Sequence, residues 1–317
     1  MGRYVAGDSP EMDRKIREAI KGIGGDIEAL RLPKLLGVVL CGGYGRGEGG
    51  VAELARGKRR LSDSFEFCTV ARDGAGHRDL AAIQAALVPV SVRWRDMLGV
   101  SMDFGRVKTL KSIRRFQDGV AVQNLLHGYC DVAGMKGSEM FRDVAVRQPS
   151  ELPWIEAVRE LVNCGVGLVF TVESDAKGFV LRNVNKCVLG AGDALLIARG
   201  QYAWKMADRA AALGDPRYTA AMECNFRPVG KKVCGSDEAR KMWFAAVDNV
   251  LETGQKSGVM KRSFGQAVRW LLRRKTIGDR KTLGYDPVLR MLLELVGVVR
   301  AERTMPPSLR RDWEVFG

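Results

Sequence analysis

The sequence predicts an α+β protein in which a sheet domain with flanking helices precedes an all-helical domain. Short apolar runs between glycines and charged residues mark the first 135 residues and are typical of strands. After about residue 150, apolar residues instead recur at steps of three and four, which is the helical period. The length of 317 residues suits two domains, which we expect at 1–148 and 149–317.

The first domain is expected to alternate helices and strands. Residues 11–30 carry isoleucines at helical steps and predict a helix. Residues 35–41 form a short apolar run that is β-branched at its centre and ends before two glycines, which predicts a buried strand. Further strands are expected at 65–70 and 100–104, with a helix at 77–87 between them.

The second domain is expected to contain amphipathic helices only. Ser150 and Pro153 precede a long apolar run and predict a helix that begins near residue 154. Residues 183–213 predict one long helix or two joined ones. Three more amphipathic helices are expected at 236–251, 263–277 and 285–299.

The composition argues against several classes of protein. Apolar residues make up 46% and charged residues 28%, without repeats, so a disordered or solenoid chain is excluded. We find no apolar run of membrane-spanning length and no signal-peptide pattern, and we therefore expect a cytoplasmic protein with no membrane partner. Seven scattered cysteines without a CxxC pair indicate reduced thiols. Two histidines argue against a zinc site and against histidine-dependent hydrolases.

The charge is strongly basic and concentrated near the C-terminus. Lys and Arg number 51 against 37 Asp and Glu, a net charge of +14, and residues 227–317 hold 19 basic and 10 acidic side chains. A block at 269–275 surrounds Trp270 with cations, which favours an anionic partner such as RNA or DNA. A solvated helix surface has the same pattern, so both interpretations stay open.

A glycine-rich segment, CGGYGRGEGG at residues 41–50, follows the first expected strand. Glycines let backbone N–H groups approach a phosphate, although an ordinary strand-to-helix turn would also use them. Gly45, Gly47 and Gly50 fit the dinucleotide fingerprint, but residues 51–64 are too charged and broken to be the helix which that motif requires. No GxxxxGK[ST] motif occurs. A phosphate-binding turn of another kind is therefore the hypothesis.

Two acidic residues lie on the second and third expected strands. Gly42 and Gly43 follow a strand, Glu66 lies on the second expected strand, and Asp103 lies between apolar residues on the third. This pattern resembles the polymerase-β-type nucleotidyltransferase family, close to its minimal and kanamycin-type members. The resemblance covers about residues 30–135 and continues weakly into the helical region. It implies a nucleotidyltransferase-like mixed sheet followed by a helical substrate or partner domain.

The resemblance also implies a chemistry. Two acids at i and i+2 of a strand point to one side, and a third on a later strand completes a cage for Mg²⁺ or Mn²⁺. Ions held there bind a nucleotide triphosphate, activate the attacking hydroxyl and stabilise the leaving pyrophosphate. Glu66 and Asp103 are accordingly the implied catalytic and metal-binding residues. The implied nucleotide-binding residues are Gly42, Gly43, Tyr44, Arg46 and Ser64.

The first acidic position is degenerate. In a gap-free alignment Ser64 occupies it, and Asp63 falls one place early. Neighbouring residues of a strand face opposite sides, so Asp63 can be a catalytic metal ligand only through a bulge or a frayed strand start. Two functions remain open: transfer of a nucleoside monophosphate from Mg-NTP to a hydroxyl acceptor, or a catalytically impaired protein of this fold that binds nucleotide or nucleic acid.

Overall fold

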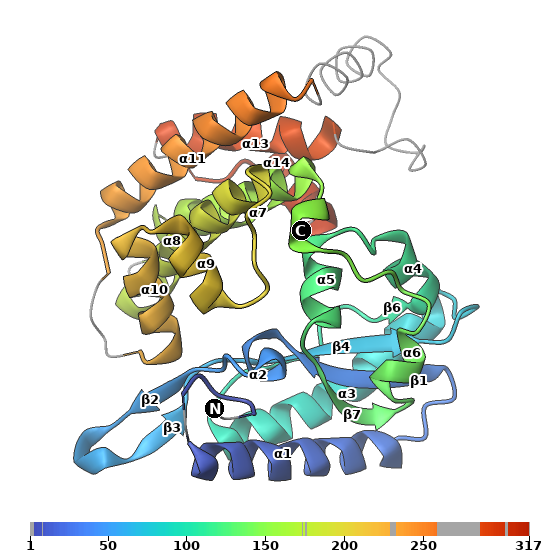
Figure 1. Ribbon diagram of the computed structural model, residues 1–317. Helices are drawn as coiled ribbons and strands as arrows, with labels where there is room; N and C mark the ends of the chain where they lie inside the picture. The colour runs from blue at the N-terminus through green and yellow to red at the C-terminus, as the bar shows by residue number, and fades with distance from the viewer. Residues whose placement is uncertain are drawn as a thin grey trace. The chain divides into compact units, whose positions relative to one another are not determined.

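The protein is a mixed α+β chain, as expected, and divides into two compact units. The computed structural model (Figure 1) describes residues 3–7, 9–172, 174, 176–228, 233–258, 286–301 and 304–316. The first unit comprises Met1–Arg147 and Glu223–Lys231, and the second comprises Gln148–Met222 and Lys232–Gly317. The division after Arg147 lies one residue before the expected boundary, whereas the return of 223–231 to the first unit was not expected.

The first unit contains most of the expected elements and several short additional ones. They are α1 (Pro10–Ala29), β1 (Leu35–Cys41), α2 (Gly42–Arg46), β2 (Val51–Glu53), β3 (Arg59–Leu61), β4 (Phe65–Ala71), α3 (His77–Leu98), β5 (Met102–Asp103), β6 (Lys108–Thr109), α4 (Leu110–Arg115), α5 (Val120–Leu126), β7 (Cys130–Gly134) and α6 (Gly137–Met140). Helix α3 continues past the expected end at residue 87 and includes Pro89. Packing of the buried Val90 and Trp94 offsets the hydrogen bond that proline removes.

The main sheet has the order β5–β4–β1–β7, and β6 also pairs with β4. Strand β1 is antiparallel to both β4 and β7, whereas β4 is parallel to β5 and β6. Strands β2 and β3 form a separate two-stranded antiparallel ribbon. The ribbon lies in the charged segment 51–64, which was rightly excluded as a helix but was not recognised as a hairpin.

Alternate side chains of the sheet face two different cores, as the period of two in a strand requires. On one face, Val38, Leu40, Phe65 and Phe67 pack against α1 and α3 (Figure 1). On the other face, Val39 and Val70 pack with apolar side chains of α4, α5 and α6. Glu66 lies between Phe65 and Phe67, so it belongs to this second face.

The second unit is helical in the part that the structure describes. Its helices are α7 (Trp154–Val172), α8 (Lys177–Ala198), α9 (Met206–Leu213), α10 (Pro216–Phe226, whose last residues belong to the first unit), α11 (Ser236–Lys256), α13 (Asp286–Arg300) and α14 (Pro307–Phe316). The segment 183–213 is therefore two helices, separated near Gly200, whose φ is +65°. Trp243 is fully buried, and its indole N–H donates to the carbonyl of Leu161 at 2.8 Å.

Two sequence expectations concern residues that are not described. The predicted helix 263–277 and the basic block 269–275 lie outside the described residues, so RNA or DNA binding by that block stays a prediction. All seven cysteines are described, and none of them forms a disulfide. Among the helices that the structure describes, none combines the length and the apolar character needed to cross a membrane.

Candidate functional site

A single row of side chains crosses three strands at one end of the sheet. Cys41 of β1 is the register partner of Glu66 in β4, and Glu66 is the register partner of Asp103 in β5. Because register partners of a sheet share a face, the two carboxylates lie on the same side, away from α1 and α3. Glu66 and Asp103 are both exposed. The two acids that the resemblance implies as metal ligands are therefore neighbours in strand register.

Gly42 and Gly43 directly follow Cys41, the last residue of β1. Gly42 has a φ of +64°, the left-handed region that favours glycine. In addition, Oε2 of Glu66 occupies the space in which a Cβ of residue 42 would lie. The backbone conformation therefore favours glycine at this position, and the lack of a side chain lets the Glu66 carboxylate lie against the backbone of the turn.

Asp63 approaches the same turn from its other side. Its Oδ2 lies 2.8 Å from the position that a Cβ of Gly43 would take. Its Oδ1 accepts the backbone N–H of Ser64 at 2.9 Å, while its own backbone N–H donates to the Tyr44 hydroxyl at 3.3 Å. Asp63 precedes the first residue of β4, Phe65, so it occupies the kind of loose strand start that its role as a ligand would need.

Tyr44 supports the turn from inside the core. Its side chain is fully buried, and its ring centroid lies 4.8 Å from that of Phe65. Its hydroxyl donates to the carbonyl of Gly50 at 2.9 Å and accepts the backbone N–H of Asp63, which joins the glycine-rich segment to the chain just before β4. Burial raises the pKa of Tyr44. The expectation of Tyr44 as a nucleotide-binding side chain is corrected to a structural role, because no part of the ring faces solvent.

Arg46 and Ser64, two other expected nucleotide-binding residues, are both partly buried. Nε of Arg46 donates to Oε2 of Glu48 at 3.0 Å, and the two side chains are 18% and 11% exposed. Arg46 therefore stands in a fixed position beside the turn, since a nearly buried ion pair leaves it few conformations. The backbone N–H of Ser64 is the group that holds Asp63, so Ser64 contributes to the site through its main chain.

Charges of both signs converge on Cys41. Burial, followed by the influence of Cys68 and Glu66, raises the pKa of Cys41 to about 12. The cations Arg46 and Lys108 oppose this rise without cancelling it. Cys41 is therefore a neutral thiol and not a nucleophile. Its surroundings show that two cations and a carboxylate act on one point at the end of β1.

The acids do not form a ready-made metal cage. Within the residues that the structure describes, no group of three His, Cys, Asp or Glu side chains is placed to hold a metal ion. Oδ1 of Asp103 accepts the backbone N–H of Gly105 at 2.7 Å. Carboxylate oxygens nevertheless suit Mg²⁺, which is commonly held by one or two carboxylates together with substrate phosphates. The donor set thus fits an ion that arrives with a nucleotide.

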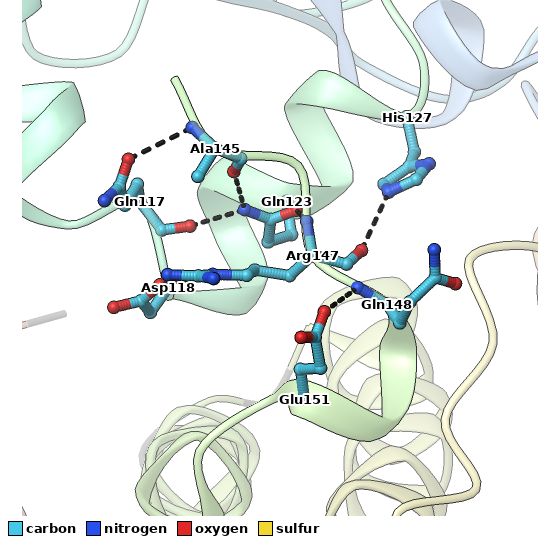
Figure 2. Close-up of polar contacts among 8 residues, drawn as sticks. All are labelled: Gln117, Asp118, Gln123, His127, Ala145, Arg147, Gln148 and Glu151. Carbon is cyan, nitrogen blue, oxygen red and sulfur yellow. Dashed lines mark hydrogen bonds and ion pairs between the residues drawn. The ribbon is translucent and has the colours of Figure 1, made fainter. Parts of the chain in front are cut away.

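A second polar network in the first unit has a structural role (Figure 2). Fully buried Gln123 donates through Nε2 to the carbonyls of Gln117 and Ala145 at 2.6 and 2.8 Å, and its Oε1 accepts the N–H of Arg147 at 2.8 Å. A ring nitrogen of His127 lies 3.4 Å from the carbonyl of Arg147. Because the Gln123 amide is satisfied internally, the network fixes the segment before Gln148 and offers no reactive group.

Comparisons with known proteins leave this geometry without a relative. No family model matches the chain, and neither a curated protein nor a solved structure is significantly similar to it.

Proposed function

We propose that the protein is a nucleotidyltransferase that transfers a nucleoside monophosphate from Mg-NTP to a hydroxyl acceptor. The observation that carries this proposal is the placement of two carboxylates against two glycines. Glu66 fills the Cβ space of Gly42, and Asp63 lies 2.8 Å from the Cβ space of Gly43. Asp103 is next to Glu66 in register.

The strand arrangement supports the proposal as well. The glycine pair directly follows β1, the acid Glu66 is on the antiparallel neighbour β4, and Asp103 is on the strand parallel to β4. This is the order of strand, glycine turn, acidic strand and later lone acid by which the chain resembles polymerase-β-type nucleotidyltransferases. The structure adds Asp63 to the turn at the place where the alignment had Ser64.

The proposed mechanism assigns a task to each of these residues. Glu66, with Asp63 or Asp103, would share the ion that accompanies the nucleotide with its phosphates, and Gly42 and Gly43 let Glu66 and Asp63 approach the main chain closely. When bound, Mg²⁺ supplies charge neutralisation on the phosphates and a lower pKa for the attacking hydroxyl. The acceptor oxygen would form a bond to the α-phosphorus while a carboxylate of the site takes the hydroxyl proton, and pyrophosphate would leave in line with the electron pair of the broken Pα–O bond.

Isotope transfer tests this proposal directly. The protein is incubated with NTPs labelled at the α- or the γ-phosphate, with Mg²⁺ or Mn²⁺, with and without cellular RNA. We expect α-label to enter an acceptor and γ-label to leave as pyrophosphate. Glu66→Gln should lower the rate by about 100-fold or more, because the transition-state charge loses a stabilising ion. Asp96→Asn, a change at an exposed acid of α3, is the control. Transfer of γ-label, or full activity of Glu66→Gln, would contradict the proposal.

A second candidate function is a catalytically impaired member of the same fold that binds nucleotides without transferring them. The specific observation in its favour is that the described residues offer no group of three acids for a metal. The same samples decide between the two candidates. Saturable NTP binding with no movement of α-label under any of these conditions would support the second.

A further inference from the structure

The strand at the edge of the site is broken, and its two halves pair with opposite ends of β4. At one end Glu66 pairs with Asp103, and at the other Val70 pairs with Lys108. Between the halves the chain leaves the sheet at Gly105, whose φ is +56°. The carbonyl of Phe104 there accepts the Thr69 hydroxyl at 3.1 Å. These contacts fix where the chain re-enters the sheet at β6.

The register places Lys108 on the face that carries the acids. Glu66 and Val70 are four residues apart on β4, so their side chains point to the same side. Val70 packs into the core of the second face, and Lys108 is its partner in the neighbouring strand. Lys108 is exposed. Asp103, the last residue of β5, and Lys108, the first residue of β6, therefore project from one face on the two sides of the break.

Lys108 lies four residues along β4 from the register position of Asp103. Four residues of strand correspond to roughly 13 Å between the row of Val70 and that of Glu66, and Cys68 lies between them. The stem of Lys108 is long and flexible, so its ammonium group can approach a phosphate chain that extends from the acids along this face of the sheet.

Lys108 is also available to a ligand. In the described part of the chain its ammonium group takes part in no ion pair, whereas Arg46 is already bound to Glu48 at 3.0 Å. A triphosphate beside Asp63, Glu66 and Asp103 would need positive charge on the side that the metal does not cover. We propose that Lys108 binds the phosphate tail of the nucleotide, an inference that rests on the proposed function. Lysine suits this task as a mobile point charge for phosphate oxygens.

Binding of inorganic tripolyphosphate and of ATP tests the proposal without requiring turnover. Titration calorimetry is carried out on the full chain at low salt, with and without Mg²⁺, for the wild type, Lys108→Ala and Lys108→Arg. The matched control is Lys34→Ala, which removes the same charge from an exposed residue just before the opposite end of β1. Thermal melts confirm that each variant is folded.

We expect Lys108→Ala to weaken both ligands by about tenfold or more, since charged hydrogen bonds have energies of that order. Lys108→Arg should keep most of the affinity, and Lys34→Ala should match the wild type. If wild-type protein binds Mg-ATP and Lys108→Ala binds it equally well, the role of Lys108 is wrong while the proposed function stands. If Lys34→Ala weakens binding as much as Lys108→Ala, the effect is one of overall charge and the proposal is overturned. If the wild type binds neither ligand, both proposals fail.

Discussion

Among the described residues, acids of the first unit and acids of the second unit differ in the groups that hydrogen-bond or pair with their carboxylates. In the first unit, Asp63 and Asp103 accept backbone N–H groups from residues one or two positions further along. In the second unit, Asp193 of α8 accepts the hydroxyl of Tyr218 at 2.6 Å and lies 3.4 Å from Nε of Arg209. These acids of the first unit have local backbone donors, whereas Asp193 has side-chain partners from other helices of the fold.

Burial separates the two groups further. Glu156 and Arg209 of the helical unit are 5% and 3% exposed. Burial raises the pKa of Glu160 to about 8, and the nearby Asp193 and Glu156 add to the rise while Arg209 opposes it. A strongly shifted pKa is often taken as a sign of a functional site. Here the shifted group lies close to the internally paired Asp193 and Arg209, so the shift by itself does not mark a functional site.

The largest expected effect is on the buried pair. Asp193→Ala should lower the free energy of unfolding by about 3 to 5 kcal/mol, because it leaves Arg209 buried without its carboxylate. Asp237→Ala, which removes an 85% exposed carboxylate that lies 3.5 Å from Arg240, should cost at most about 1 kcal/mol. Urea denaturation measures both. Equal losses in the two variants would show that the helical cluster is not internally paired.

The pH dependence of stability tests the role of burial at Glu160. Its pKa is raised to about 8 in the folded state, so the folded protein holds a proton that the unfolded chain releases near its ordinary value of 4.5. Stability should therefore fall as pH rises from about 4.5 to 8 and level off above that. Glu160→Gln should flatten this slope and stabilise the protein by about 2 to 3 kcal/mol at pH 9. Asp248→Asn, at an exposed site of α11, should leave the slope unchanged in the same thermal melts.

Alanine substitutions at two glycines with similar φ angles distinguish the cost of backbone strain from an effect on the candidate site. Gly42 and Gly57 have φ values of +64° and +70°, but only Gly42 has a carboxylate in its Cβ space. Alanine at either position should cost about 1 kcal/mol from backbone strain, and Gly42→Ala should cost more because it displaces Glu66. Nucleotide binding should be lost in Gly42→Ala alone. Calorimetry with Mg-ATP checks this, and equal binding by both variants would count against the turn as the site.

The smallest expected effect on the free energy of unfolding comes from replacing the exposed Asp103. Asp103→Asn should change the free energy of unfolding by no more than about 0.5 kcal/mol, since the side chain is exposed and accepts only a local N–H. A thermal melt of this variant, compared with the label-transfer assay, sharpens the contrast with Asp193. A large loss of stability would place Asp103 among the structural acids.

The sequence indicated the main strands because their signals are local. The run that became β1 was bounded correctly, and the period of two around Glu66 and Asp103 gave their shared face. The continuation of α3 beyond Pro89 depends instead on tertiary contacts, including the bond from the Trp94 indole to Asp26 at 2.8 Å. Such contacts leave no periodic signal in the sequence.

The same reasoning explains what the sequence could not show about Asp63, Lys108 and Tyr44. Asp63 reaches the turn because a buried tyrosine, Tyr44, holds its backbone, and spacing on a strand cannot show that. Lys108 lies on a two-residue strand, which is too short to have a period. Tyr44 itself was assigned to the ligand because it lies within the glycine motif, whereas its apolar ring follows the core.

The most direct measurement of the central claim is Mn²⁺ binding followed by electron paramagnetic resonance, with and without a non-hydrolysable NTP. Because the described residues offer no group of three such side chains for a metal ion, we expect the ion alone to bind weakly and to bind strongly with nucleotide. Asp63→Asn and Glu66→Gln should each weaken the ternary complex by about tenfold or more, and Ser64→Ala should not. Loss of binding in Ser64→Ala with none in Asp63→Asn, or nucleotide-independent binding that survives Glu66→Gln, would contradict the assignment of this turn as the site.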